Sequence, residues 1–113
     1  TVHHPLEADR LPERGVDYLG LGPVFASASK DNVDPPLGPA GLRELVRHVR
    51  ARRPGLPCCA IAGIDHDNAG EVMAVGVDGV AVIGDIFMAE DVAAAARRLL
   101  AVVDTALARR RAA

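Results

Sequence analysis

Three short apolar segments are spaced along the chain, at residues 16–22, 57–63 and 78–84, and each ends in glycine. Their apolar residues follow one another nearly without interruption instead of alternating with polar ones. This pattern is typical of parallel strands that are buried on both faces of a sheet. Each segment therefore predicts one strand of a parallel sheet.

Amphipathic patterns between these segments predict helices. Pro39 suits the first turn of a helix that runs to about residue 53. Asp65 is a candidate cap for a second helix, which ends at Gly76, and Asp91 for a long last helix. Residues 5–15 look like the end of one more helix. The inner face of the Pro39 helix is expected to carry Leu42, Leu45, Val46 and Val49, and that of the last helix Val92, Ala95, Ala96, Leu99, Val103 and Leu107.

Helices and strands alternate in this reading, which predicts a single α/β domain over residues 1–113 built of right-handed βαβ units. An open doubly wound sheet would carry a glycine-rich phosphate turn after its first strand, but residues 20–25 do not match that motif. A short helix expected at residues 83–87 favours a barrel, because barrels often hold phosphate beside such a helix. A whole barrel needs about 200–250 residues. The prediction is therefore the C-terminal half of a (β/α)₈ (TIM) barrel.

Composition narrows the function classes. The net charge of −2 argues against a general nucleic-acid or membrane surface. No apolar stretch approaches the roughly 18–20 residues that span a bilayer. The basic stretch 109–113 is expected to be a disordered chain end. Adjacent Cys58 and Cys59 would point to opposite faces of a strand, which favours a reduced pair in a cytoplasmic protein.

Candidate phosphate ligands follow the predicted strands. Gly22, Gly63 and Gly84 would lie on one rim of a barrel, where backbone N–H groups can approach an anion closely. Lys30 is the only lysine of the chain, in a loop with serine hydroxyls that can also bind phosphate. A solvated loop lysine and ordinary turn glycines are the alternatives.

A second cluster of polar residues invites a metal hypothesis. Asp65, His66 and Asp67 are residue types that bind metal ions. Consecutive residues at a helix start fan out around its axis and cannot easily converge on one ion. Helix capping is therefore the favoured interpretation.

At these residues the chain resembles a known family. Residues 15–42, 60–87 and 93–100 resemble the C-terminal half of thiamine-phosphate synthase, with its G-P-[VI]-[FY]-P-T-x-T-K, A-I-G-G-I and V-[VI]-S-A-I motifs. The resemblance implies a (β/α)₈ barrel that joins hydroxymethylpyrimidine pyrophosphate to thiazole phosphate and releases pyrophosphate. It also implies Mg²⁺, with ligands in earlier strands that this chain does not contain. Catalysis would then be chiefly positioning and electrostatic.

The resemblance also implies roles for single residues. Lys30 would be catalytic, because it matches the lysine that contacts the leaving pyrophosphate. Thr1 falls where a serine touches the pyrimidine substrate. The thiazole phosphate would be held by Ser27, Ser29, Gly63, Ile83 and Gly84.

Three departures from the family pattern bear on this site. Ala62 replaces the first glycine of the glycine pair, and Gly84 replaces a serine. Asp85 replaces a small residue and brings a negative charge beside the proposed phosphate. That charge would weaken binding unless the carboxylate is paired or turned away.

Two rival functions remain open. A sister family, the thiazole tautomerases, shares the fold and uses a histidine at a position that His3 fits, although Pro23 favours the synthase. For His3 a structural or capping role is the favoured interpretation. The second rival is a non-catalytic half-barrel, either a remnant or a fusion domain. A half-barrel exposes sheet edges and an apolar face, so it would pair with a second copy or with a missing N-terminal half.

Overall fold

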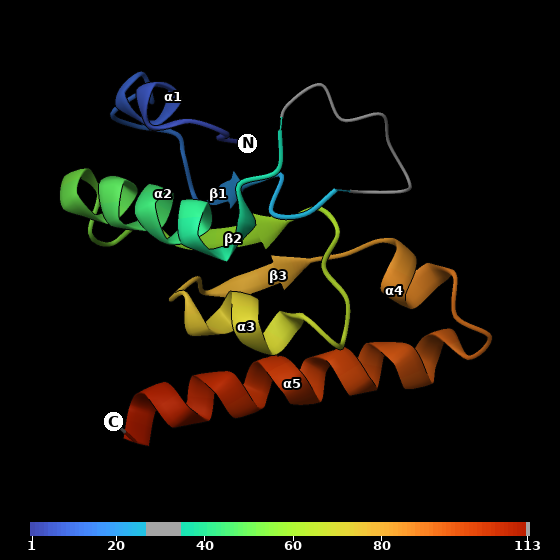
Figure 1. Ribbon diagram of the computed structural model, residues 1–113. Coiled ribbons are helices and arrows are strands. Elements are labelled where there is room, and N and C mark those ends of the chain that lie inside the picture. Colours follow the sequence, from blue (N-terminus) through green and yellow to red (C-terminus); the bar gives the residue numbers. More distant parts are fainter. Residues whose placement is uncertain (27–34, 113) are drawn as a thin grey trace.

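Three short parallel strands form the sheet of the computed structural model, which describes residues 1–26 and 35–112 (Figure 1). Strand β1 is Leu19–Leu21, β2 is Cys58–Ile61 and β3 is Gly79–Ala81. Their order in the sheet is β1-β2-β3, and both pairings are parallel. The parallel sheet expected from the apolar segments is thereby confirmed.

Helices alternate with these strands in the predicted order. The order of elements is α1, β1, α2, β2, α3, β3, α4 and α5. The short helix α4 lies between β3 and the long α5 along the chain, as expected (Figure 1). The bounds of the helices are Pro5–Asp9 for α1, Gly38–Arg52 for α2, Ala69–Ala74 for α3, Gly84–Phe87 for α4 and Val92–Ala112 for α5.

Side chains on the two faces of the sheet differ in burial. Positions alternate between buried and partly exposed along β1 and β2, whereas β3 has no buried position. Leu21 and Cys58 are fully buried in the core that the helices share, while Cys59 and Ile61 are only partly buried. The expectation of burial on both faces was wrong, because the described part of the chain covers only one face.

Helix α2 packs as its amphipathic pattern predicts. Its four expected inner residues are all buried, at 3% exposure or less: Leu42, Leu45, Val46 and Val49. In α5 the expected cap is also confirmed, because Asp91 Oδ1 accepts a hydrogen bond from the Ala94 amide at 3.0 Å. Only Ala95 and Leu99 of its inner face are buried, however, and Val92 is 41% exposed. Val92 begins the helix next to α4, where side chains are themselves exposed.

Helix α3 begins three residues later than expected. The carboxylate of Asp65 accepts hydrogen bonds from the amides of Asp67 and Asn68, at 2.8 and 2.9 Å. Such bonds close a tight turn and compete with helix geometry. Asp65 therefore caps the turn that leads into α3, and the helix begins at Ala69.

The C-terminal end of the chain corrects another expectation. Residues 109–113 were predicted to be a disordered tail, but α5 continues through Ala112. Arg110 donates a hydrogen bond from its guanidinium to the carbonyl of Met73, which fastens the last turns of α5 to the end of α3. Within the described residues, no helix is both long and apolar enough to span a bilayer.

Ion pairs and hydrogen bonds close the end of the sheet at which the strands begin. Arg50 donates to the Gly76 carbonyl at 2.6 Å and to Asp78 Oδ2 at 3.1 Å. The same Asp78 oxygen accepts the Cys58 amide at 2.8 Å. The residues that the sequence suggests as phosphate ligands, Gly63, Ile83 and Gly84, follow the strands at the opposite end of the sheet.

Candidate functional site

The N-terminus of the chain lies beside the carboxyl end of β1. Val2 forms a parallel bridge with Leu21, and its amide donates to the Gly20 carbonyl at 2.7 Å. A Cβ built on Gly20 would lie 3.7 Å from Thr1 Oγ1. Thr1 is therefore at the end of the sheet where the resemblance expects the pyrimidine substrate, and its side chain is next to the uncovered face.

The loop that follows β1 is bound to the end of β2. The Val24 amide donates to the Ile61 carbonyl at 3.0 Å, and the Phe25 amide donates to the Ala62 carbonyl at 3.2 Å. These bonds continue the pairing of the two strands beyond their ends. The start of the lysine-containing loop consequently lies against the segment that holds Gly63.

The other end of this loop returns to the same place. The Leu37 amide donates to the Pro23 carbonyl and the Gly38 amide to the Val24 carbonyl, both at 2.8 Å. Both ends of the loop are thus fastened where β1 finishes. The expected ligands Ser27, Ser29 and Lys30 lie outside the described residues.

Gly63 occupies a position that no larger residue fits. Its φ is +69°, and an added Cβ would lie 2.7 Å from the Phe25 Cβ and 2.8 Å from the Ala26 carbonyl oxygen. Asn68 Nδ2 donates to the Gly63 carbonyl at 3.0 Å, which holds the turn from the other side. A packing requirement therefore explains Gly63 independently of any ligand.

Ala62, the residue before it, also has a left-handed backbone, with φ of 79°. This conformation costs an L-residue about 1–2 kcal/mol, whereas glycine adopts it freely. The family pattern that the chain resembles has glycine there. The backbone at residue 62 therefore keeps the left-handed conformation that glycine adopts freely, although the residue is alanine.

Ile83 and Gly84 mark the end of β3 and the start of α4. The Ile83 side chain is 59% exposed, and nothing lies within 4 Å of a Cβ built on Gly84. Their surroundings are therefore open among the described residues. A ligand could approach this stretch of backbone closely, as the expected phosphate contact requires.

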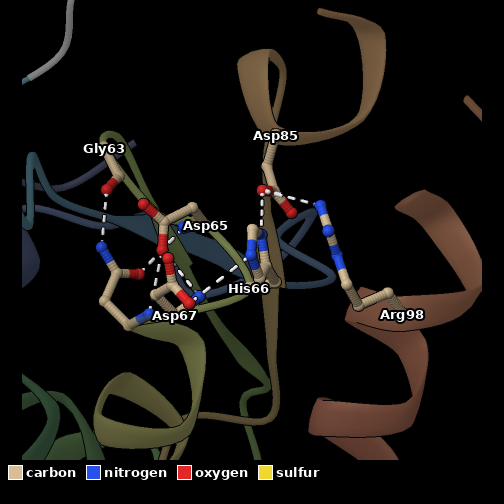
Figure 2. Close-up of polar contacts among 7 residues, drawn as sticks. Gly63, Asp65, His66, Asp67, Asp85 and Arg98 are labelled. Carbon is tan, nitrogen blue, oxygen red and sulfur yellow. Dashed lines mark hydrogen bonds and ion pairs between the residues drawn. The ribbon is translucent and has the colours of Figure 1, made fainter. Parts of the chain in front are cut away.

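Asp85, which directly follows these residues, has a buried side chain that lies between His66 and Arg98. Its carboxylate is 4% exposed, and Oδ1 lies 2.8 Å from His66 Nδ1 and 3.8 Å from Arg98 Nη2 (Figure 2). Figure 2 shows the side chain pointing toward His66 and Arg98. The sequence raised the possibility that this charge is paired, and the structure confirms the pairing.

The partners of Asp85 were missed by reasoning from the sequence. His66 was considered for capping or metal binding, and Arg98 was given no role. The one available signal was Asp85 itself, an acidic residue in an apolar segment that must find a cation when buried. Its sequence separation of 19 residues from His66 hides the pair from local patterns.

The N-terminal histidines hold α1. His4 Nδ1 accepts the Leu6 amide at 3.1 Å as the N-cap of the helix. His3 Nδ1 lies 3.4 Å from Glu7 Oε2, and the His3 amide donates to the other oxygen of that carboxylate at 3.3 Å. These contacts agree with a capping role for this stretch.

Among the described residues, neither the two thiols nor a group of metal-binding side chains adds a reactive group to the site. Cys58 and Cys59 are both free, and burial raises the pKa of each thiol. A raised pKa keeps them protonated near neutral pH, and therefore poorly nucleophilic. Within residues 1–26 and 35–112, no three His, Cys, Asp or Glu side chains are grouped closely enough to hold a metal ion, so these residues do not fit a Mg²⁺ site.

Comparison with known proteins identifies the family to which the chain is similar. A sequence profile of the family described as thiamine monophosphate synthase matches residues 1–86. The chain belongs to this family. The curated thiamine-phosphate synthase of Chloroflexus aurantiacus is 43% identical over 103 residues, and that of Methanocella arvoryzae is 47% identical over 97 residues.

A solved structure of the same family shows the same fold. The thiamine phosphate pyrophosphorylase of Pyrococcus furiosus superimposes with a TM-score of 0.71 at 41% identity, covering 91% of this chain. The match covers only 45% of that protein. The chain likewise spans 45% of the Chloroflexus relative and 43% of the Methanocella relative. It therefore corresponds to slightly less than half of a typical family member.

Proposed function

We propose that this chain forms the thiazole-phosphate half of a thiamine-phosphate synthase with a (β/α)₈ barrel. The observation that carries the proposal is the bonding of Val24 and Phe25 to Ile61 and Ala62. It brings the start of the Lys30 loop against Gly63, as the family site requires. In the proposed site the thiazole phosphate is held by Ser27, Ser29, Gly63, Ile83 and Gly84.

The proposed reaction joins two substrates. The bond between the pyrimidine methylene carbon and pyrophosphate breaks, and pyrophosphate leaves with the electron pair. The thiazole nitrogen then forms the new carbon–nitrogen bond with its lone pair. Lys30 offsets the charge that develops on pyrophosphate, and Thr1 contacts the pyrimidine. Mg²⁺ is an expectation for this family, and no step is assigned to it.

The proposal includes a partner that completes the barrel. Strand β3 is paired only with β2 in the described sheet. Beyond it, Ile83, Phe87 and Met88 are exposed by 59%, 67% and 85%. Such an apolar edge favours association with further strands. These would come from an N-terminal half or from a second copy of the chain. A cytoplasmic location, in keeping with the two unbridged cysteines, belongs to the same proposal.

Ligand binding provides the first test. Thermal unfolding of the purified protein is measured with thiazole phosphate and, as the matched control, with the unphosphorylated thiazole alcohol. At 100 times the Kd, a ligand adds about 2.7 kcal/mol to stability, and we expect a rise of about 10 °C with the phosphate only. Equal melting temperatures in all samples would overturn the proposed site.

Product formation provides the second test. The protein is incubated with both substrates and Mg²⁺, and thiamine phosphate is measured by chromatography. We expect no product from the 113-residue chain by itself, because its partner is missing. We expect product when the remaining half of a family barrel is added, and its loss in Lys30→Ala. Product formed with Lys30→Ala at the unsubstituted rate would refute the role of Lys30.

A further inference from the structure

Asp85 is the most completely buried charged side chain beside the proposed phosphate site. Only 4% of the side chain is exposed, and its Oδ2 atom has no hydrogen-bond partner among the described residues. A buried carboxylate is strongly unfavourable unless hydrogen bonds and opposite charges compensate it. What surrounds Asp85 therefore decides whether the site can accept an anion.

His66 compensates the buried carboxylate of Asp85 through a direct hydrogen bond. Its Nδ1 atom is 2.8 Å from Asp85 Oδ1, a full hydrogen bond. Arg98 is farther away, with Nη2 at 3.8 Å from the same oxygen and a side chain that is 49% exposed. Arg98 therefore contributes through its charge, and solvent screens that contribution.

The second ring nitrogen of His66 also faces a carboxylate. Nε2 lies 3.4 Å from Asp67 Oδ1 (Figure 2). Only a protonated ring can donate from both nitrogens at once. The Asp67 side chain is 84% exposed, however, so water replaces this second contact at little cost. The contact with Asp85 is the one that matters for burial.

The contact between His66 and Asp85 also joins two segments that the proposed site needs. His66 lies in the turn after β2, three residues beyond Gly63, and Asp85 lies in α4 directly after Gly84. The hydrogen bond between them connects these two segments. Arg98 adds a contact from α5. The carboxylate is thereby held on the side of His66 and Arg98.

We infer that His66 is a positioning residue for phosphate binding, which acts by holding and offsetting the carboxylate of Asp85. The inference rests on the proposed function. Without His66, both carboxylate oxygens would lack a hydrogen bond, and the side chain would turn toward water. It would then lie close to the backbone of Ile83 and Gly84 and repel a bound phosphate.

A double-mutant cycle on ligand affinity separates this role from a general structural one. The Kd of thiazole phosphate is measured calorimetrically for the unsubstituted protein, His66→Ala, Asp85→Ala and the double variant. We expect His66→Ala to weaken binding about tenfold, since a repulsion of about 1.4 kcal/mol corresponds to that factor. Asp85→Ala is expected to bind at least as tightly as the unsubstituted protein.

Rescue in the double variant is the deciding result. Once Asp85 is removed, His66 has no charge to offset, so His66→Ala/Asp85→Ala should bind within about threefold of Asp85→Ala. If His66→Ala weakens binding as much in the Asp85→Ala background, or not at all in the native one, the inference is wrong. If His66→Ala does not fold, His66→Phe replaces it, because phenylalanine keeps a ring of similar size and removes the hydrogen-bond donor.

The same measurements distinguish this inference from the function on which it rests. If the unsubstituted protein does not bind thiazole phosphate, the proposed function fails and the inference with it. If it binds and the cycle shows no coupling, only the role of His66 is refuted. The unphosphorylated thiazole alcohol is a second control, since its affinity should not change in any of the four proteins.

Discussion

Gly63 packs so closely on Phe25 that the two loops beyond β1 and β2 meet without space for one methyl group. A Cβ added to Gly63 would lie 2.7 Å from the Phe25 Cβ, a distance that real Cβ atoms essentially never show. The φ of +69° adds a backbone penalty for any L-residue. This contact is the point where the lysine-containing loop and the proposed phosphate site touch.

Gly63→Ala is therefore expected to lower the free energy of unfolding by about 2–4 kcal/mol, since overpacking and the left-handed backbone both contribute. Urea denaturation followed by circular dichroism measures the change. Gly55→Ala is the matched control, because its added Cβ has nothing within 4 Å. An equal loss in both variants would show that the close contact with Phe25 is not the cause.

Ala62→Gly is expected to have the opposite effect. Alanine at φ of 79° is strained by about 1–2 kcal/mol, and glycine relieves the strain but adds about 0.4–1 kcal/mol of unfolded-state entropy. The net expectation is a gain of about 0.5–1 kcal/mol in the free energy of unfolding. Ala101→Gly, in the middle of α5, should lose about 1 kcal/mol. A loss in Ala62→Gly would contradict the strain.

The order of elements could be predicted from the sequence because its signals are local. Apolar runs, a proline at the start of α2 and a cap at Asp91 each act within a few residues. The burial of each face of the sheet could not be predicted, because the burial of β2 depends on which segments cover it. Likewise, the start of α3 depends on the competing turn that Asp65 closes.

The residues of the candidate site also differ in whether the sequence alone could predict their role. Gly63 could be found by its motif, and the structure adds the close contact with Phe25 that requires glycine there. The pairing of His66 with Asp85 depends on how the turn after β2 faces α4, which no local pattern encodes. A buried acidic residue indicates that a compensating side chain lies nearby, but it does not identify that side chain.

Asp78 is expected to be important for stability, because its carboxylate, directly before β3, binds both α2 and β2. Oδ2 accepts the buried Cys58 amide at 2.8 Å and an Arg50 hydrogen bond at 3.1 Å. Asp78→Ala leaves that amide without an acceptor and should lower the free energy of unfolding by about 1–3 kcal/mol. Asp78→Asn keeps an acceptor oxygen and should lose less.

Asp104→Ala is the control for that series, since Asp104 is exposed in α5 and has no ion pair or side-chain hydrogen bond among the described residues. It should change stability by less than about 0.5 kcal/mol. Denaturation by urea at one pH compares all three variants. If Asp78→Asn loses as much as Asp78→Ala, the charge and not the hydrogen bond to Cys58 is what stabilises this end of the sheet.

The buried thiols make stability depend on pH above neutrality. Burial raises the pKa of Cys58 and Cys59 above the ordinary value of 9.0. Well below pH 9 both thiols are protonated in the folded and the unfolded chain, so they add no pH dependence there. Above pH 9 the unfolded chain loses these protons first, which stabilises it, and the free energy of unfolding must fall as pH rises.

Comparison with Cys58→Ala isolates this effect. The variant loses a roughly constant amount of stability through the smaller side chain. Its free energy of unfolding should nevertheless fall less steeply than that of the unsubstituted protein between pH 9 and 10.5, because one titrating group has been removed. Urea denaturation at half-unit steps of pH measures both curves, and contributions common to the two proteins cancel in their difference. Parallel curves would mean that the Cys58 thiol titrates equally in the folded and unfolded chain, and would contradict the raised pKa expected from its burial in the core.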